Sequence, residues 1–409
     1  MKRVMKRTAA VTALTLCAVM LSGCSAVSKF IENDSNIGKN KPALGTVDQS
    51  VTTVVIAETE ETVQTEAEKV DRTAEKAAKI LSEMTVEEKL AQLILARYPD
   101  NAAEVMSEYQ LGGYTMYAED FQYGTAESVK AETDEVKSAA KVTPFIAVDE
   151  EGGSVVRISC WEQYCSEPFS SPQVLYQRGG SELLAVDSEE KSELLKSLGI
   201  NLNLAPVCDI TDDTSAYIYD RTVGQDAETT AAAITSIVEA ANSVGVASCL
   251  KHFPGYGSST DTHTGYAQDD RLLSEILSSD VVPFSAGIAV SENMQPAVMV
   301  SHNVYSQINA ELPASLAPEI YSLLRNQVGF NGVAITDDLS METAANYGGE
   351  APASVAAVTA GADMICVSDY KSAYSELSAA YDDGTITDKM LDEHVTRILV
   401  MKIQYKICT

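Results

Sequence analysis

The segment Gly245-Val246-Ala247-Ser248-Cys249-Leu250-Lys251-His252-Phe253-Pro254-Gly255 changes abruptly from an apolar run to charged and aromatic residues. Its first six residues have the composition of a buried strand, and the Pro-Gly pair at its end predicts a turn. Beyond the turn lies a polar loop in which Asp261 and His263 stand two residues apart. This layout is typical of an active-site loop at the end of a strand, although a surface loop that carries a histidine is the plainer alternative.

Similar apolar runs recur along the chain and alternate with longer amphipathic segments. The predicted strands cover residues 93–97, 113–117, 144–148, 200–207, 246–250, 297–301, 332–336 and 363–367. Segments with helical periodicity lie between them, for example residues 227–243, 272–290 and 354–360. Near-continuous apolar strands joined by helices form parallel sheets that are covered on both faces. Eight such units favour an α/β fold with a single (β/α)8 barrel of the TIM type over a doubly wound open sheet.

Chemically active side chains follow five of these apolar runs. The residues in question are Asp149, Asp209, Lys251-His252, His302 and Asp337-Asp338. A parallel barrel gathers the carboxyl ends of its strands at one face, where barrel enzymes carry their active sites. A single Asp after a strand is often a helix N-cap, but five strand ends with Asp, Lys or His favour one common pocket.

The charge and motif content of the chain narrows the chemistry of such a pocket. A formal net charge of −30 argues against a nucleic-acid partner, whose phosphates need lysine and arginine. The chain shows no glycine-rich phosphate cradle, and no Cys/His spacing suggests zinc. Carboxylates, arginine and lysine can instead bind sugar hydroxyls. Glycoside hydrolysis needs one group that attacks or steers water, for which Asp337 is the candidate, and a second carboxylate or histidine that protonates the leaving oxygen.

Several segments resemble the β-N-acetylglucosaminidases of glycoside hydrolase family 3. The resemblance runs from about residue 71 to the C-terminus and is carried by Met84-Thr85-Val86-Glu87-Glu88-Lys89, Asp149-Glu150-Glu151-Gly152-Gly153 with Val156-Arg157, Asn203-Leu204-Ala205-Pro206-Val207, Asp220-Arg221-Thr222-Val223-Gly224, Lys251-His252-Phe253-Pro254-Gly255 and Ile335-Thr336-Asp337-Asp338-Leu339-Ser340-Met341. The Lys-His-Phe-Pro-Gly and Thr-Asp-Asp-Leu-Ser-Met motifs are specific together, because they occur in order and at strand ends.

This resemblance implies a retaining, exo-acting β-N-acetylglucosaminidase on a single barrel, without a metal ion or an organic cofactor. It implies that Asp337 is the nucleophile and that His263, oriented by Asp261, is the acid/base. It also implies that the non-reducing-end sugar is held by Asp149, Arg157, Arg221, Lys251 and His252. An Asp close to a His can fix the tautomer of the ring, which agrees with the implied pair.

The sequence leaves some alternatives open. For Arg157 and Lys251, the alternative to a substrate contact is a structural ion pair with a neighbouring carboxylate. Tyr256 stands where many relatives have His, and in them the spacing from the Pro-Gly turn to Asp-x-His is often one residue longer. The sugar is therefore open, so β-glucosidase or β-xylosidase action and a glycoside phosphorylase remain alternatives. A non-catalytic sugar-binding lipoprotein is a further alternative.

The N-terminal residues are predicted to be a targeting signal rather than part of the fold. The basic segment Met1-Lys2-Arg3-Val4-Met5-Lys6-Arg7 precedes a short apolar stretch and then Leu21-Ser22-Gly23-Cys24. This resembles a bacterial lipobox, in which the cysteine is lipidated; an ordinary secretory signal with a chance cysteine is the alternative. We therefore expect a lipoprotein signal peptide over residues 1–23 and a lipid anchor at Cys24 that tethers an extracytoplasmic protein to the bacterial cell membrane.

The remaining expectations concern the linker, the domain and the cysteines. A flexible polar linker is predicted over residues 24–70, and the barrel domain over residues 71–409. A capping-box pattern at Thr85-Val86-Glu87-Glu88 predicts the start of a helix. Cys160 and Cys165 could form a disulfide in an exported protein or remain free. We expect a monomer whose partners are a carbohydrate substrate and the membrane.

Overall fold

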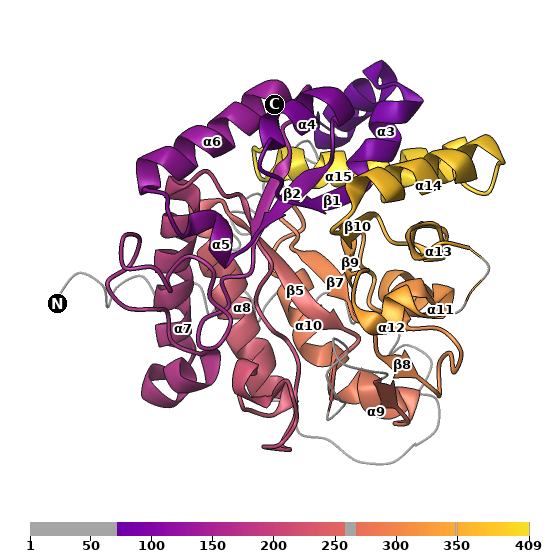
Figure 1. The fold of residues 1–409 in the computed structure, drawn as a ribbon. Coiled ribbons are helices and arrows are strands. Elements are labelled where there is room, and N and C mark those ends of the chain that lie inside the picture. Colours follow the sequence, from indigo (N-terminus) through magenta and orange to yellow (C-terminus); the bar gives the residue numbers. More distant parts are fainter. Residues whose placement is uncertain (1–71, 258–266, 348, 350, 409) are drawn as a thin grey trace, which may run out of the picture. The chain divides into compact units, whose positions relative to one another are not determined.

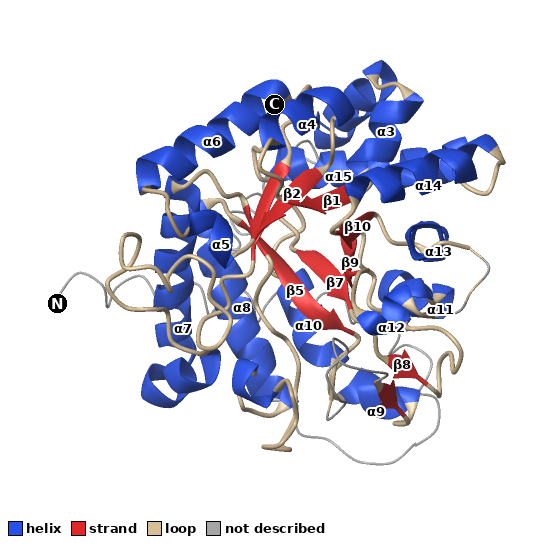
Figure 2. Cartoon of the chain, in the orientation of Figure 1, coloured by secondary structure: helices blue, strands red, loops and turns tan. Residues whose placement is uncertain are grey.

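Eight parallel strands close into a barrel that helices surround (Figures 1 and 2). The computed structural model describes residues 72–257, 267–347, 349 and 351–408 of the chain. The strands follow one another around the barrel in the order β1 (Ile94–Arg97), β10 (Met364–Val367), β9 (Ala334–Asp338), β7 (Ala297–Val300), β5 (Ala247–Phe253), β4 (Leu202–Asn203), β3 (Phe145–Val148) and β2 (Gly113–Met116). Because β1 pairs with both β2 and β10, the sheet has no edge there. The predicted barrel is confirmed and the open sheet is wrong.

The helices follow the strands in the alternating order expected of this fold. A first helix covers residues 72–83. The others are α3 (Val86–Gln92), α4 (Ala102–Tyr109), α5 (Ala118–Phe121), α6 (Ala126–Ala139), α7 (Pro172–Ser197), α8 (Ala227–Val244), α9 (Leu273–Ser278), α10 (Val281–Ile288), α11 (Pro318–Ser322), α12 (Glu342–Ala345), α13 (Ala353–Ala360), α14 (Tyr370–Asp382) and α15 (Asp388–Gln404). Two short strands, β6 (Gln268–Asp269) and β8 (Val304–Tyr305), pair outside the barrel. None of the helices in the described part is long and apolar enough to span a membrane.

Local sequence signals explain where several helices begin and end. At α3, Glu88 N donates to Thr85 Oγ1 over 3.3 Å and Thr85 N donates to Glu88 Oε2 over 3.0 Å, which confirms the predicted capping box. The Asp226 side chain accepts from Thr229 N at the start of α8. The same helix ends at Gly245, whose φ of 90° favours glycine.

The structure corrects the predicted bounds of three strands and one helix. The strand expected over residues 200–207 shrinks to the two residues of β4, since Pro206 has no N–H to continue the ladder. The helix expected over residues 272–290 is broken into α9 and α10, because the chain leaves helical geometry at Ser279 before the buried Asp280. Strands β5 and β9 run further than predicted, so Lys251-His252 and Asp337-Asp338 belong to the strands themselves.

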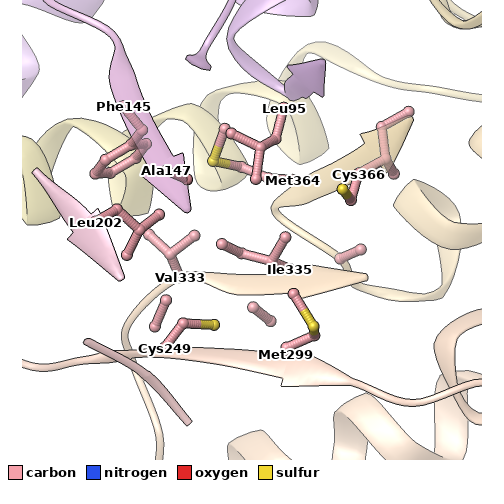
Figure 3. Packing of buried hydrophobic residues seen from close by; sticks show 14 of the residues in the cluster. Leu95, Phe145, Ala147, Leu202, Cys249, Met299, Val333, Ile335, Met364 and Cys366 are labelled. Atoms are coloured by element: carbon pink, nitrogen blue, oxygen red, sulfur yellow. The ribbon is translucent and has the colours of Figure 1, made fainter. Parts of the chain in front are cut away.

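Side chains from alternate strand positions fill the inside of the barrel. Figure 3 shows Phe145 and Ala147 of β3, Val333 and Ile335 at β9, and Met364 and Cys366 of β10 pointing into one cluster. The spacing of two residues is the period of a strand, so each strand sends one face inward. Burying each large apolar side chain stabilises the fold by about 1.5–3 kcal/mol. This core fixes the strand ends on which the polar residues stand.

A buried charge cluster supports the opposite, N-terminal end of the barrel. Asp363, just before β10, accepts from Arg325 Nη2 at 2.6 Å and from Arg397 Nη1 at 2.9 Å. His394 Nδ1 lies 2.9 Å from the same carboxylate, and Ala334 N at the start of β9 donates to it. Burial alone would raise the pKa of Asp363, but these partners lower it to about 2. The cluster ties α15 to the strand ends.

We expect Asp363→Asn to lower the free energy of unfolding by about 3 kcal/mol at neutral pH, because Arg325, Arg397 and His394 lose the carboxylate that they share. Because the folded pKa is depressed, the carboxylate stabilises the fold above its unfolded pKa of about 3.9, and this contribution is lost as the pH falls toward about 2. Urea unfolding at several pH values measures the difference. Asp382→Asn, at an exposed position at the end of α14, is the matched control. Equal unfolding free energies of wild type and Asp363→Asn at neutral pH would contradict the assignment.

Candidate active site

A cavity of about 600 Å³ opens at the carboxyl ends of the strands. Every predicted substrate-binding residue lines it, as does the predicted nucleophile: Asp149, Arg157, Arg221, Lys251, His252 and Asp337. They come from segments as far apart in sequence as β3 and β9, and the closed barrel brings them together. Asp261, His263 and Cys24 lie outside the described residues, as do the predicted signal peptide and all of the predicted linker.

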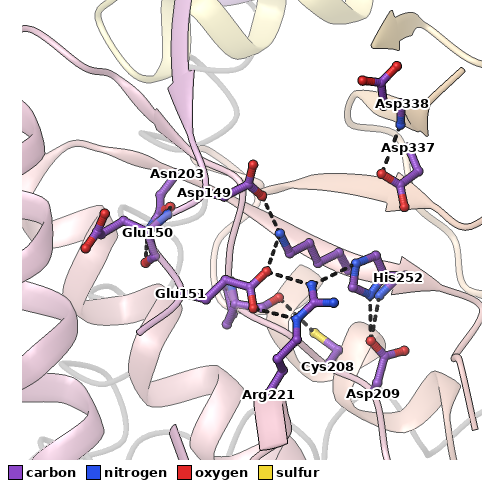
Figure 4. A network of polar contacts seen from close by, with 12 residues as sticks. Asp149, Glu150, Glu151, Asn203, Cys208, Asp209, Arg221, His252, Asp337 and Asp338 are labelled. Carbon is purple, nitrogen blue, oxygen red and sulfur yellow. Dashed lines mark hydrogen bonds and ion pairs between the residues drawn. The ribbon is translucent and has the colours of Figure 1, made fainter. Parts of the chain in front are cut away.

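A buried carboxylate, Glu151, joins two cations in the wall of the cavity (Figure 4). Arg221 donates from Nε to Glu151 Oε2 at 2.9 Å and from Nη2 to Oε1 at 2.8 Å. Lys251 Nζ lies 2.6 Å from Glu151 Oε1 and 2.6 Å from Asp149 Oδ1. Burial would raise the pKa of Glu151, but the two cations outweigh it and lower that pKa. The three groups therefore form a charged network.

The turn after β3 determines which side chains reach this network. Glu151 N and Gly152 N both donate to Val155 O, which folds the chain back on itself. Gly152 has a φ of 102°, and a Cβ there would lie 2.3 Å from Ser170 O, so a side chain is excluded. The return of the chain brings Arg157 into the lining of the cavity that Asp149 and Glu151 also line.

His252 is held in one tautomer by its two neighbours. Its Nδ1 lies 2.7 Å from Asp209 Oδ2, and its Nε2 lies 3.3 Å from Arg221 Nη2. Arginine can only donate, so Nε2 accepts and Nδ1 carries the hydrogen that is donated to Asp209. Asp209 also accepts from His252 N and Tyr256 N, which fixes the carboxylate. Asp209 therefore fixes the orientation of the His252 ring.

Asp337 presents a carboxylate to the cavity from the end of β9. Asp338 N donates to Asp337 Oδ1 over 2.9 Å. Burial would raise the pKa of Asp337, but the neighbouring imidazoles of His252 and His302, this hydrogen bond and the ammonium group of Lys251 lower it. An anionic carboxylate at this position suits a nucleophile. Asp338 is engaged differently, because its Oδ1 accepts from Ser340 N.

Lys251 and Arg157 differ in their ion pairing. Lys251 does form ion pairs, but both of its carboxylate partners line the cavity. Arg157 takes part in no salt bridge among residues 72–257 and 267–408 as far as they are described, and its buried Nε has no hydrogen-bond partner there. Its guanidinium carbon lies 5.8 Å from the centre of the Tyr117 ring. The structural ion pair considered for Arg157 is therefore absent from the described residues, and its Nε lacks a partner among them.

Sequence reasoning missed several residues of the site. Glu151 belongs to the Asp149-Glu150-Glu151-Gly152-Gly153 motif and Asp209 follows an apolar run, but the sequence alone assigns neither of them a role. Tyr117 and Tyr217 line the cavity and lie on loops with no motif of their own. Tyr256 is buried, and its ring lies 5.4 Å from that of His252 in an edge-on contact. No local sequence signal identifies Glu151, because the cations that a buried carboxylate needs, Arg221 and Lys251, lie far from it along the chain.

The cysteines of the described ranges are free thiols, and no metal-binding cluster is found in these ranges. Cys160 and Cys165 are both free, so the disulfide considered for them is absent. Cys208, Cys249 and Cys366 are buried thiols, as their apolar surroundings predict. No group of three or more His, Cys, Asp or Glu side chains in the described part of the chain is arranged to hold a metal ion.

Comparison with known proteins identifies the family. The model of the glycosyl hydrolase family 3 N terminal domain matches residues 85–401. The chain belongs to glycoside hydrolase family 3. It is 38% identical over 240 residues to a beta-hexosaminidase of Stenotrophomonas maltophilia, which covers 57% of this chain and 69% of the relative. A beta-hexosaminidase of Methylococcus capsulatus is 31% identical over 296 residues, or 72% of this chain and 86% of the relative.

A solved structure agrees with the sequence relatives. The family 3 beta-N-acetylglucosaminidase of Paenibacillus sp. FPU-7 superposes with a TM-score of 0.73 at 30% identity. The match covers 79% of this chain and 63% of the Paenibacillus chain, so this chain spans less than two thirds of that protein. The chain is thus a glycoside hydrolase whose cavity lies at the carboxyl ends of the barrel strands.

We expect Glu151→Gln to lower kcat/KM by about tenfold or more, because Lys251 and Arg221 lose the charge that orients both of them. Steady-state kinetics with an aryl β-glycoside that the enzyme cleaves measures the loss. Glu189→Gln, at an exposed position on α7, removes a carboxylate outside the cavity and serves as the control. Unchanged kcat/KM in Glu151→Gln would show that the network does not organise the site.

Proposed function

We propose that this family 3 enzyme is a retaining, exo-acting β-N-acetylglucosaminidase. It removes terminal β-linked N-acetylglucosamine from glycans or cell-wall fragments. The observation that carries the proposal is the cavity in which the carboxylate of Asp337 stands beside the Glu151, Lys251 and Arg221 network. A nucleophile and a cluster of fixed donors and acceptors in one cavity are what a glycosidase needs. The hexosaminidase names of the relatives support the choice of sugar.

The proposed reaction has two steps. In the first, Asp337 attacks the anomeric carbon, the glycosidic bond breaks, and His263 gives its proton to the leaving oxygen. In the second, His263 takes a proton from water, and the resulting hydroxide displaces Asp337 from the anomeric carbon. Two inversions retain the configuration of the sugar.

The predicted substrate-binding residues hold the sugar in this scheme. Asp149 accepts from a sugar hydroxyl, and Lys251 and Arg157 donate to hydroxyl oxygens. Arg157 is well suited because its donors are not taken by a carboxylate in the described part of the chain. His252 lies in the same wall of the cavity, where its Nε2 accepts from Arg221 Nη2. Tyr256, which also lines the cavity, lies two residues before the segment that carries Asp261 and His263. That proximity supports the acid/base role of the pair.

A panel of aryl β-glycosides tests the proposal. The N-acetylglucosaminide should be cleaved faster than the glucoside or the xyloside, at a rate that added phosphate does not change. A rate that depends on phosphate and releases a sugar phosphate would indicate a phosphorylase. Binding of the sugars without any turnover would indicate a non-catalytic protein.

The nucleophile can be identified by trapping it. Because a covalent glycosyl-enzyme forms on Asp337, Asp337→Ala should abolish turnover of all substrates, to less than about 0.1% of wild type. In the wild type, a slow 2-fluoro glycoside should leave an adduct on the peptide that contains Asp337, and mass spectrometry locates it. An adduct on another residue would contradict the assignment.

The acid role of His263 depends on the leaving group. His263→Ala should slow cleavage of a disaccharide by more than about 100-fold, because the alkoxide must be protonated. The same variant should retain most of the first-step rate with a dinitrophenyl glycoside, whose phenolate leaves unaided. Measuring both substrates separates acid catalysis from misfolding. An equal loss for both would argue against His263 as the acid.

We also propose that the protein is lipid-anchored through Cys24 at the outer face of the bacterial cell membrane. The Leu21-Ser22-Gly23-Cys24 motif after a basic, apolar N-terminal segment supports this. In cells, wild type should partition into the detergent phase of Triton X-114, whereas Cys24→Ser should appear in the aqueous phase. Detergent partitioning of the Cys24→Ser variant would contradict the anchor.

A further inference from the structure

Glu150, which lies between two carboxylates of the cavity wall, faces the other way. Its side chain is fully buried, and Figure 4 shows it pointing away from Glu151 and Arg221. Its backbone is fixed by Asn203, whose Oδ1 accepts from Glu150 N at 3.0 Å and whose Nδ2 donates to Glu150 O at 3.1 Å. Glu150 takes part in no salt bridge among the residues that the structure describes. The carboxylate must therefore be satisfied by neutral donors.

Those donors all come from the segment that carries Arg157. Glu150 Oε2 accepts from Arg157 N and Ile158 N, both at 2.8 Å. Glu150 Oε1 accepts from Ser159 N at 3.3 Å and Ser159 Oγ at 2.5 Å. Four donors from three consecutive residues thus converge on one side chain. Such charge-assisted bonds are about twice as strong as neutral ones, so the segment is held firmly.

The side chain of Arg157 has little else to hold it. It forms no ion pair in the described part of the chain, its Nε lacks a partner there, and its guanidinium carbon lies 5.8 Å from the centre of the Tyr117 ring. A guanidinium that is to meet a ligand must be positioned by its backbone if no side chain positions it. The bonds from Glu150 to Arg157 N and its two neighbours supply that constraint.

We propose that Glu150 is a positioning residue that presents Arg157 to the substrate. The inference rests on the proposed function, in which Arg157 donates to the sugar. Glu150 touches neither substrate nor reacting atoms, and it acts by fixing the backbone from which Arg157 reaches the cavity. Glu151 therefore orients Arg221 and Lys251 from the wall of the cavity, whereas Glu150 orients Arg157 from outside the cavity.

Steady-state kinetics of a double-mutant cycle tests this, with the aryl glycoside that the panel identifies as the substrate. Glu150→Gln keeps the size of the side chain but turns one acceptor oxygen into a donor that faces N–H groups. We expect KM to rise about tenfold with little change in kcat, since Arg157 binds the sugar in the ground state and the transition state alike. Arg157→Ala should raise KM at least as much, and the double variant should be no worse than Arg157→Ala alone.

Two further variants distinguish a specific effect on KM from a general loss of stability. Ser159→Ala removes one of the four donors and keeps the carboxylate, so KM should rise about threefold, again only when Arg157 is present. Asp363→Asn at the other end of the barrel should lower stability while leaving KM unchanged, which shows that destabilisation alone does not mimic the effect. If Glu150→Gln does not fold, the Ser159→Ala and Arg157→Ala cycle carries the test.

The outcomes separate this inference from the proposed function. An unchanged KM in Glu150→Gln, or effects of Glu150→Gln and Arg157→Ala that simply add, would overturn the positioning role while leaving Arg157 as a substrate contact. An unchanged KM in Arg157→Ala would overturn both the positioning role and the assigned contact of Arg157.

Discussion

The ion pairs of Glu151 with Lys251 and Arg221 are the interaction on which the site depends. Burying a charge in a protein costs several kcal/mol, so a buried carboxylate persists only where cations and hydrogen bonds offset that cost. Here two cations reach it from β5 and from the segment before α8, and Lys251 also reaches Asp149. One carboxylate therefore fixes the relative positions of three separate segments. The same network fixes the orientation of His252, because Arg221 donates to its Nε2 and Asp209 accepts from its Nδ1.

In the barrel, the residues that stabilise the fold and the residues that line the cavity lie at opposite ends of the same strands. The Asp363 cluster ties helices to the N-terminal end, where its cations are all engaged by one carboxylate. At the carboxyl end, Arg157 has no such partner in the described ranges, and Asp337 faces an open cavity. Polar groups that lack a protein partner lower the stability of the fold, but they can bind a ligand. The apolar interior between the two ends holds the strands in register, so the polar groups at either end have fixed places.

Much of this arrangement follows from patterns that the sequence displays. Alternating apolar runs and helical segments predict the barrel, and polar residues after the runs predict the face at which Asp149, Lys251 and Asp337 meet. The role of Glu151 could not be predicted, because it depends on two cations that are 70 and 100 residues away along the chain. The break at Ser279 also had no local signal, since it accompanies the burial of Asp280 against Arg271. Such features arise from tertiary contacts, which single-sequence patterns do not encode.

A crystal structure of the protein with N-acetylglucosamine would show whether the cavity beside Asp337 is the sugar site. We expect the anomeric carbon next to the carboxylate of Asp337, with ring hydroxyls on Asp149, Arg157 and Lys251. A sugar bound elsewhere, or bound in this cavity with its anomeric carbon turned away from Asp337, would contradict this expectation.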